Sequence, residues 1–193
     1  MDPGDDPIDA FRAWFDEAVA RGASFADAAT LATATRDGAP SARTVLYKGY
    51  DRGVLFYTNY TSRKARDLDD NPRAALVFFW VVLHRQVRME GRVERLSEAE
   101  SDAYFATRPR ETQLGAWASP QSAPVASRDE LDARFREQDE RWAGRPVERP
   151  PFWGGYRLIP EVVELWVGRE HRLHDRFLYE RADSAWRRAR LGP

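Results

Sequence analysis

The stretch GREHRLHDRF, residues 168–177, concentrates side chains that bind anions or metals. It holds three arginines and two of the chain's three histidines. If it continues as a strand, alternation places Arg172, His174 and Arg176 on one face, where they suit a phosphate or an electron-rich planar ligand. The alternative is a solvent-exposed strand edge whose charges pair only with one another. Zinc would need a third ligand beside the two histidines, and the arginines repel a dication, so we predict no metal site.

A second candidate anion site lies in SRKARDLDD. The sequence predicts a short helix capped by Ser62, with Arg63 and Lys64 in its first turn and aspartates towards its end. This order opposes the helix dipole at both ends, and an anion bound at the N-terminus would compensate for it. The alternative is an exposed helix that tolerates its charges. We favour the anion site.

Two further groups suit a phosphate. Tyr104 and Arg108 are four residues apart in SEAESDAYFATRP, a predicted helix that starts with a capping-box pattern, so we expect them on one helix face. In ARTVLYK, Arg43 and Lys48 fall on opposite faces of a regular strand, so they serve one site only if the strand is irregular. The sequence has no Gly-rich phosphate loop and no Gly-x-Ser-x-Gly motif, so side chains would have to hold any phosphate.

Composition narrows the class of protein. The 193 residues carry 30 basic and 31 acidic side chains, and this balance disfavours a nucleic-acid binder. The lack of cysteine excludes disulfides and thiolate chemistry and is compatible with the cytoplasm, where we expect the protein. The acidic N-terminus does not have the composition of a signal peptide. The longest apolar run, residues 74–83, is far shorter than the roughly 20 residues of a membrane helix, so we expect no membrane span.

These candidate residues are distributed over predicted strands and a few helices. Apolar periodicity predicts an N-terminal helix over 7–21 and barrel strands with peripheral helices over 28–193, in a single domain of residues 1–193. Three strands are expected within 28–60, and single strands at 73–83, 85–96, 156–160, 162–168, 175–181 and 184–191. Further helices are expected at 62–71, 97–109 and 127–143, and a loop at 147–156. Without βαβ alternation, this pattern indicates a mainly β fold with peripheral α (α+β), typically an antiparallel barrel.

Six stretches together resemble the pyridoxine (pyridoxamine) 5′-phosphate oxidase family. They are RTVLYK, FYTNYTSRKARDL, RQVRMEGRVERLS, YFATRPRETQLGAWASPQS, FWGGYR and ELWVGREHRLHDRFLYER. The resemblance runs from about Asp6 to Pro193 and implies an FMN-binding split β-barrel that forms a homodimer with FMN at the subunit interface. It implies oxidation of pyridoxine or pyridoxamine 5′-phosphate at C4′ to pyridoxal 5′-phosphate, with hydride passing to the flavin and O₂ reoxidising it to give H₂O₂.

The resemblance also implies roles for individual residues. The implied FMN contacts, partly from the partner subunit, are Arg43, Lys48, Tyr57, Thr58, Arg63, Lys64, Gln86, Gln121, Ser122, Trp166 and Arg176. The implied grip on the substrate phosphate comes from Lys48, Tyr104, Arg108 and Thr112. Arg172 and His174 would place the substrate ring and are the expected catalytic residues, whereas His171 has no assigned role.

Two departures and two alternatives accompany the resemblance. Thr112 stands where the family commonly has serine, and Tyr47 replaces an aliphatic residue. One alternative is a related FMN oxidase that acts on another ring, of the phenazine type. The other is a flavin- or pyridoxal-phosphate-binding protein without turnover. The intact RLHDR and RPRETQ stretches favour the vitamin B6 substrate.

Overall fold

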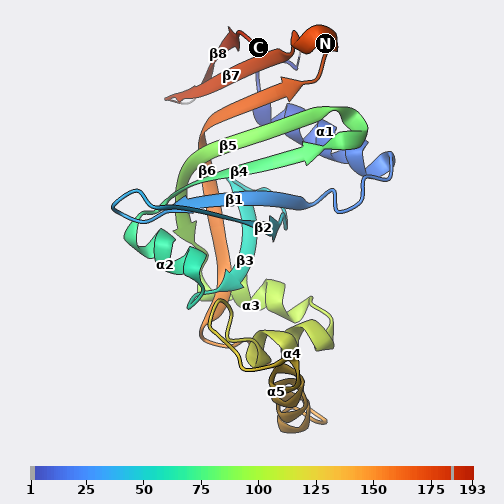
Figure 1. Ribbon diagram of the computed structural model, residues 1–193, viewed down its shortest axis with the longest axis vertical. Coiled ribbons are helices and arrows are strands. Elements are labelled where there is room, and N and C mark those ends of the chain that lie inside the picture. The colour runs from blue at the N-terminus through green and yellow to red at the C-terminus, as the bar shows by residue number, and fades with distance from the viewer. Residues whose placement is uncertain (1–2, 184) are drawn as a thin grey trace.

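The computed structural model describes residues 3–183 and 185–193 (Figure 1). Its helices are α1 (Pro7–Ala20), α2 (Arg63–Asp70), α3 (Glu98–Ala106), α4 (Arg110–Ala118) and α5 (Arg128–Arg141). Its strands are β1 (Ala28–Ala34), β2 (Pro40–Leu46), β3 (Val54–Asn59), β4 (Arg73–Trp80), β5 (Arg85–Arg95), β6 (Trp153–Val167), β7 (Asp175–Ala182) and β8 (Ala185–Leu191). Two short 3₁₀ turns are η1 (Val81–Leu83) and η2 (Glu170–Arg172).

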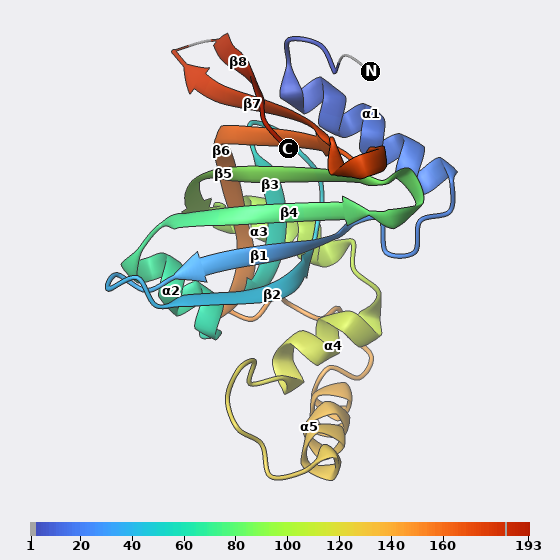
Figure 2. The same ribbon diagram turned by 45° about the horizontal axis from the view of Figure 1, so that its top comes forward.

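The strands form one antiparallel sheet in the order β2-β1-β4-β5-β6-β7-β8, with β3 paired to β6. The long strand β6 pairs with β3 along its first half and with β7 along its second half, while β5 follows it on the other edge. Within the described residues no ladder joins β2 to β3, so the curled sheet stays open there (Figures 1 and 2). The predicted mainly β, split-barrel fold is confirmed.

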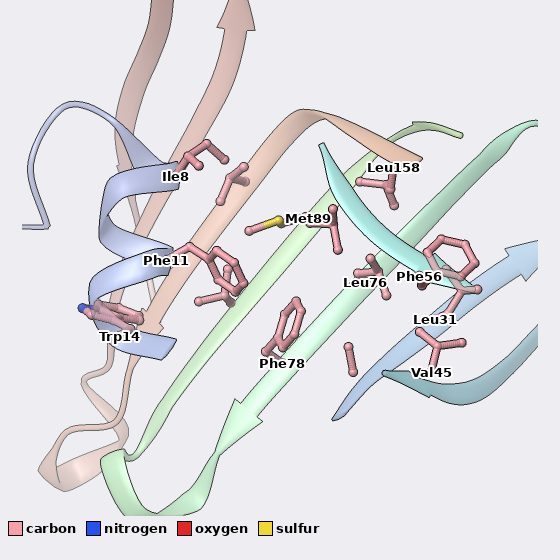
Figure 3. Close-up of a cluster of buried hydrophobic side chains, with 14 of the residues drawn as sticks. Ile8, Phe11, Trp14, Leu31, Val45, Phe56, Leu76, Phe78, Met89 and Leu158 are labelled. Atoms are coloured by element: carbon pink, nitrogen blue, oxygen red, sulfur yellow. The ribbon is translucent and has the colours of Figure 1, made fainter. Parts of the chain in front are cut away.

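Helix α1 closes the core of the barrel (Figure 3). Its start is fixed by Asp6, whose carboxylate accepts the Ile8 N–H at 2.7 Å, and the predicted helix over 7–21 is confirmed to within one residue. Phe11 is fully buried and its ring centroid lies 5.0 Å from that of Phe78 on β4. Tyr47 packs edge-on against the same Phe11 ring at 5.4 Å. Burial of each such large side chain stabilises the fold by roughly 1.5–3 kcal/mol.

A second apolar cluster lies outside the barrel, where α3, α4 and α5 project from one end of the sheet (Figures 1 and 2). Its buried members are Phe105, Leu114, Ala116, Trp142, Val147 and Trp153. Tyr57 of β3 and Tyr104 of α3 pack against it. The helical layer is thereby fixed to the start of β6, close to the residues predicted to bind phosphate.

Several predicted boundaries differ from the structure. Residues 156–160 and 162–168 belong to one strand, β6, which already starts at Trp153, inside the predicted loop. Pro160 suggested a break, but it lies opposite Gly91 where the β5–β6 register shifts, and such an irregularity tolerates a residue without an N–H. The strand predicted over 73–83 ends at Trp80, and η1 follows.

Two helix predictions also need correction. Helix α4 was not predicted as a separate helix, because the stretch after Pro109 has little apolar periodicity. Ser62 precedes α2 as predicted, but its side chain makes no capping hydrogen bond. The strand predicted from residue 184 is β8, and Ser184 itself lies outside the described residues.

The bulge at Gly91 allows a direct stability test. A Cβ at this position would lie 1.9 Å from the Ile159 carbonyl oxygen. We expect Gly91→Ala to destabilise the protein by about 3 kcal/mol and to lower its Tm by roughly 6–12 °C. The matched control is Gly115→Ala inside α4, where no atom lies within 4 Å of the added carbon and the Tm should rise slightly. Equal melting temperatures for the two variants in calorimetry would contradict the prediction.

Candidate active site

A cavity of about 460 Å³ opens between the barrel and the helical layer. Eight of the predicted site residues line it: Lys48, Tyr57, Thr58, Lys64, Tyr104, Arg108, Thr112 and Gln121. A neighbouring cavity of about 390 Å³ shares Thr44, Lys64 and Gln121 with it and adds Arg43, Arg63 and Ser122. We call these two cavities and their eleven predicted residues the pocket half.

Lys64 lies at the junction of the two cavities and is 7% exposed. Its Nζ donates to Thr58 Oγ1 at 3.0 Å, to Gln121 Oε1 at 3.2 Å and to Ser62 Oγ at 3.3 Å. In the described part of the chain no carboxylate forms an ion pair with it. Burial, with a smaller contribution from the nearby Arg43 charge, lowers the pKa of Lys64 to about 8. The site therefore holds a buried cation that an anion would stabilise.

Arg108 forms a second cationic pole of the same pocket. It lies in the turn after α3, so the prediction that it shares a helix face with Tyr104 is wrong, although both side chains line the cavity. Its guanidinium lies 4.6 Å from the ring centroid of Trp153, and its buried Nη1 has no hydrogen-bond partner among the described residues. Burial lowers the pKa of Arg108, against the effect of Tyr104. The Tyr104 ring stacks on Tyr57 at 3.8 Å, which fixes this wall.

Arg43 and Lys48 reach adjoining cavities, which resolves their opposite strand parity. Strand β2 ends at Leu46, so Lys48 is free of the alternation, and its Nζ pairs with Asp27 at 2.9 Å beside the larger cavity. Arg43 lies within β2 and lines the smaller cavity. Its Nη1 donates to Thr33 Oγ1 at 2.6 Å.

The remaining five predicted residues lie elsewhere, on and beside β5, β6 and β7. Gln86, Trp166 and Arg176 are register partners across these three strands, on the sheet face opposite the core. Arg176 donates from Nε and Nη2 to the buried Glu164 at 2.8 and 3.2 Å, and this bond raises the pKa of Arg176. We call these residues, together with Arg172 and His174, the sheet half.

Arg172 and His174 are not part of a strand, so the predicted alternation across RLHDR is wrong. Arg172 ends η2, and both His171 and Arg172 adopt left-handed backbone conformations, with φ of 56° and 61°. The chain must reverse between β6 and β7, and this turn takes the place of the expected strand. His174 Nδ1 accepts the Arg169 N–H at 3.1 Å and its ring lies 4.6 Å from Trp166, so a neutral His174 presents Nε2–H as a donor. His171 is exposed and lines no cavity described above.

The two halves do not meet within one chain. Tyr57 of the pocket half lies on β3, opposite Gly155 near the start of β6. Trp166 of the sheet half lies eleven residues further along β6, roughly 36 Å along the strand. Among the described residues, the two cavities of the pocket half are lined by no residue of the sheet half.

Some residues that build the site were not predicted. Thr44, Val45, Leu46, Pro109 and Trp153 also line the larger cavity. Asp67 pairs with the predicted Arg43, and Glu164 pairs with the predicted Arg176. A single sequence gives no signal for such partners, because they meet only after folding. Within the described residues no cluster of three metal-ligating side chains occurs, and none of their helices is long and apolar enough to cross a membrane.

An open antiparallel barrel with a cationic pocket between sheet and helices places the protein in the split β-barrel class. A family model described as pyridoxamine 5′-phosphate oxidase matches residues 15–140. A second, described as the pyridoxine 5′-phosphate oxidase C-terminal dimerisation region, matches residues 153–193. The chain belongs to the pyridoxamine 5′-phosphate oxidase family, as its motifs predicted. The matched dimerisation region supports a homodimer.

Individual relatives agree with this membership. The chain is 61% identical over 189 residues to a pyridoxine/pyridoxamine 5′-phosphate oxidase of Rubrobacter xylanophilus, covering 97% of this chain and 87% of that protein. It is 51% identical to the Coxiella burnetii protein of the same name, covering 97% and 96%. Among solved structures, PhzG of Burkholderia lata in complex with tetrahydrophenazine-1-carboxylic acid has a TM-score of 0.93 at 34% identity, covering 100% and 95%.

Proposed function

We propose that this protein is an FMN-dependent oxidase that converts pyridoxine or pyridoxamine 5′-phosphate to pyridoxal 5′-phosphate. The observation that carries the proposal is the presence of two separate cationic poles in one pocket. One is built by Lys64 with Arg43 and Arg63, and the other by Arg108. A cofactor and a substrate that each carry a phosphate would fill both.

The first pole fits the phosphate of FMN. Buried Lys64 lacks a carboxylate partner in the described chain, the first turn of α2 adds free N–H groups, and Ser122 adds a hydroxyl. Gln86, Trp166 and Arg176 of the sheet half offer a ring and donors for the flavin. When bound, FMN supplies a two-electron acceptor that reacts with O₂. Tyr57, Thr58, Lys48 and Gln121 line the same cavity and complete the proposed cofactor contacts.

The second pole fits the substrate phosphate. Arg108 offers an unused buried donor, and Lys48, Tyr104 and Thr112 line the same cavity. Oxidation at C4′ removes two electrons and two protons from the substrate, and O₂ takes them up to form H₂O₂. The alcohol gives the aldehyde directly, whereas the amine gives an imine that water hydrolyses to the aldehyde with release of ammonia. We assign Arg172 an electrostatic and stacking role towards the substrate ring, and His174 a hydrogen bond from Nε2–H. A neutral donor of this kind positions the substrate without acting as a strong base.

The complete site forms between two subunits in this proposal. The pocket half of one subunit meets the sheet half of its partner, because within one described chain the two cavities of the pocket half contain no residue of the sheet half. Exposed apolar side chains surround the sheet half: Phe79, Val81, Val82 and Leu173 are 45–68% exposed in the single chain. Several exposed large apolar side chains near one predicted site are typical of a protein interface. It supports a homodimer that shares its sites.

A heterodimer tests the shared site. We expect Arg108→Ala and Arg172→Ala to be poorly active alone. A tandem-tagged heterodimer of one chain of each should recover about half of wild-type activity, because one of its two shared sites has both halves intact. The inverse control pairs wild type with the double variant: both shared sites are then damaged, and activity should be lost. Activity in the control heterodimer but not in the first would place the site within one chain.

A turnover assay tests the function itself. The purified protein should show flavin absorbance and should produce H₂O₂ and an aldehyde when pyridoxine 5′-phosphate is added in air. A flavin-containing protein without products would indicate a binding protein. A protein that fails to take up FMN would remove the proposal. Turnover of a carboxylated phenazine precursor in preference to the B6 phosphates would favour the alternative suggested by the likeness to PhzG.

A further inference from the structure

Asp67 is a buried carboxylate behind the smaller cavity. It lies on α2, four residues after Arg63, and is 4% exposed. Its Oδ2 accepts hydrogen bonds from Thr33 Oγ1 at 2.6 Å and from Ser41 Oγ at 2.7 Å. The Arg43 guanidinium lies 3.6 Å from the same oxygen. Burial raises the pKa of Asp67, but the hydrogen bonds from Thr33 and Ser41 and the charges of Arg43 and Arg63 outweigh it and hold this pKa below its usual value.

The hydroxyls of Thr33 and Ser41 connect Asp67 to Arg43, because each donates to the carboxylate and accepts from the guanidinium. Each has one hydrogen, and each gives it to Asp67, so their lone pairs face the guanidinium. Arg43 Nη1 donates to Thr33 Oγ1 at 2.6 Å and Nη2 donates to Ser41 Oγ. Nη1 also donates to the Leu31 carbonyl at 3.3 Å. An ionised Asp67 accepts both hydroxyl hydrogens on Oδ2 more strongly than a neutral carboxamide or carboxyl oxygen would.

We propose that Asp67 is a positioning residue for the cofactor: it fixes the Arg43 guanidinium, through Thr33 and Ser41, against β1 and β2 at the edge of the smaller cavity. The inference rests on the proposed function, in which Arg43 contacts FMN. In the described structure Arg43 Nε and one Nη2 hydrogen have no hydrogen-bond partner, so donors are left for a ligand. An arginine fixed in this way loses less side-chain freedom when it binds.

If Asp67 acts only as a nearby charge, its neutralisation should change FMN affinity in the opposite direction. A carboxylate beside the cations of a phosphate site repels the phosphate, so its neutralisation would tighten FMN binding. A carboxylate that positions Arg43 must instead weaken FMN binding when neutralised. If Asp67 only holds α2 against the β1–β2 hairpin, its neutralisation would lower the stability of the protein, and any effect on FMN binding would not depend on Arg43.

The experiment measures FMN affinity of the full-length apoprotein by flavin fluorescence quenching. We expect Asp67→Asn to raise the Kd for FMN about tenfold. Thr33→Val keeps the charge but breaks one connection, so it should raise the Kd in the same direction and serves if Asp67→Asn folds poorly. The matched control is Asp69→Asn, which removes an equal charge two residues along α2 from an exposed pair with Arg95. Its Kd should be unchanged or slightly lower.

A double-variant cycle with Arg43→Ala decides between positioning and structure. In the Arg43→Ala background, Asp67→Asn should no longer raise the Kd, because the guanidinium that it positions is gone. Tighter or unchanged binding by Asp67→Asn and Thr33→Val, or an equal weakening with and without Arg43, would overturn the inference while leaving the proposed function standing. A wild-type protein that binds no FMN would overturn both.

Discussion

Arg108→Ala is expected to lower kcat/KM for pyridoxine 5′-phosphate by roughly 30- to 1000-fold while FMN affinity stays unchanged. The guanidinium of Arg108 is stacked over Trp153, and its Nη1 is buried without a partner among the described residues. The free energy needed to remove this Nη1 from water is therefore part of folding and does not oppose ligand binding. A phosphate would supply that missing partner through a charged hydrogen bond, which is stronger than one between neutral groups. Steady-state kinetics with flavin absorbance as a loading check measures the effect.

A comparison of substrates with and without the phosphate group provides an internal control for this prediction. Wild type should prefer the phosphorylated substrate strongly over pyridoxine, and Arg108→Ala should lose most of this preference. The matched variant is Arg110→Ala, two residues along, whose guanidinium points to Asp139 and the Trp142 carbonyl outside the cavity. Its kcat/KM should stay within about twofold. An Arg108→Ala enzyme with an unchanged preference would show that the substrate phosphate binds elsewhere.

Local features of this fold were predictable because they depend on residues close together in sequence. The capping box at Ser97 and Glu100 forms as expected: the Glu100 N–H donates to Ser97 Oγ at 3.2 Å and the Ser97 N–H to Glu100 Oε2 at 2.8 Å. Helix α1 and strands β1–β3 follow from apolar periodicity and turn residues. The anion site at the start of α2 was predicted from a local signal too, a helix end with charges of the wrong sign for its dipole, and Arg63 and Lys64 do line a cavity.

The turn at His171 and Arg172 was not predictable from alternation. Gly168 precedes the turn, but no Gly, Asn or Pro stands at its two left-handed positions, and the flanking residues alternate as in a strand. The structure uses left-handed conformations at both residues, and histidine is among the residues that tolerate this region better than most. The expected shared face of Arg172, His174 and Arg176 was therefore derived from the wrong geometry, although all three belong to the sheet half.

Long-range partners set the other limit on prediction. Asp67 meets Thr33 and Ser41 from 34 and 26 residues away. The division of the site into two halves depends on strand pairing: β3 pairs with the start of β6, whereas Gln86 and Arg176 pair with Trp166 near its end. Neither composition nor spacing contains that pairing. The resemblance named sixteen site residues, but only the fold shows which eleven share a pocket.

FMN affinity is expected to fall about tenfold between pH 7 and pH 9, because Lys64 must be protonated to bind the phosphate. Burial lowers the pKa of Lys64 to about 8 in the free protein, and a bound phosphate would raise it again. Binding above pH 8 therefore takes up a proton, and each further pH unit weakens it up to tenfold. The phosphate itself does not change in this range, since its second pKa is about 6.

The stability of the free protein should change in the opposite direction. A lysine pKa lowered by folding means that the unfolded chain binds more protons between about pH 8 and the ordinary lysine pKa of 10.5. The Lys64 contribution therefore makes the free protein more stable as pH rises through this window. Lys64→Met should remove this contribution from the pH dependence of the free energy of unfolding, measured by urea denaturation.

Lys64→Arg is the decisive variant for the affinity prediction. Arginine stays charged throughout, so FMN affinity should become independent of pH between 7 and 9 even if its absolute value changes. Lys64→Met should bind weakly and also without pH dependence. Titrations by fluorescence quenching at constant ionic strength separate the three proteins. A wild-type slope that equals that of Lys64→Arg would show that Lys64 remains charged in the free pocket and that another group controls the pH dependence.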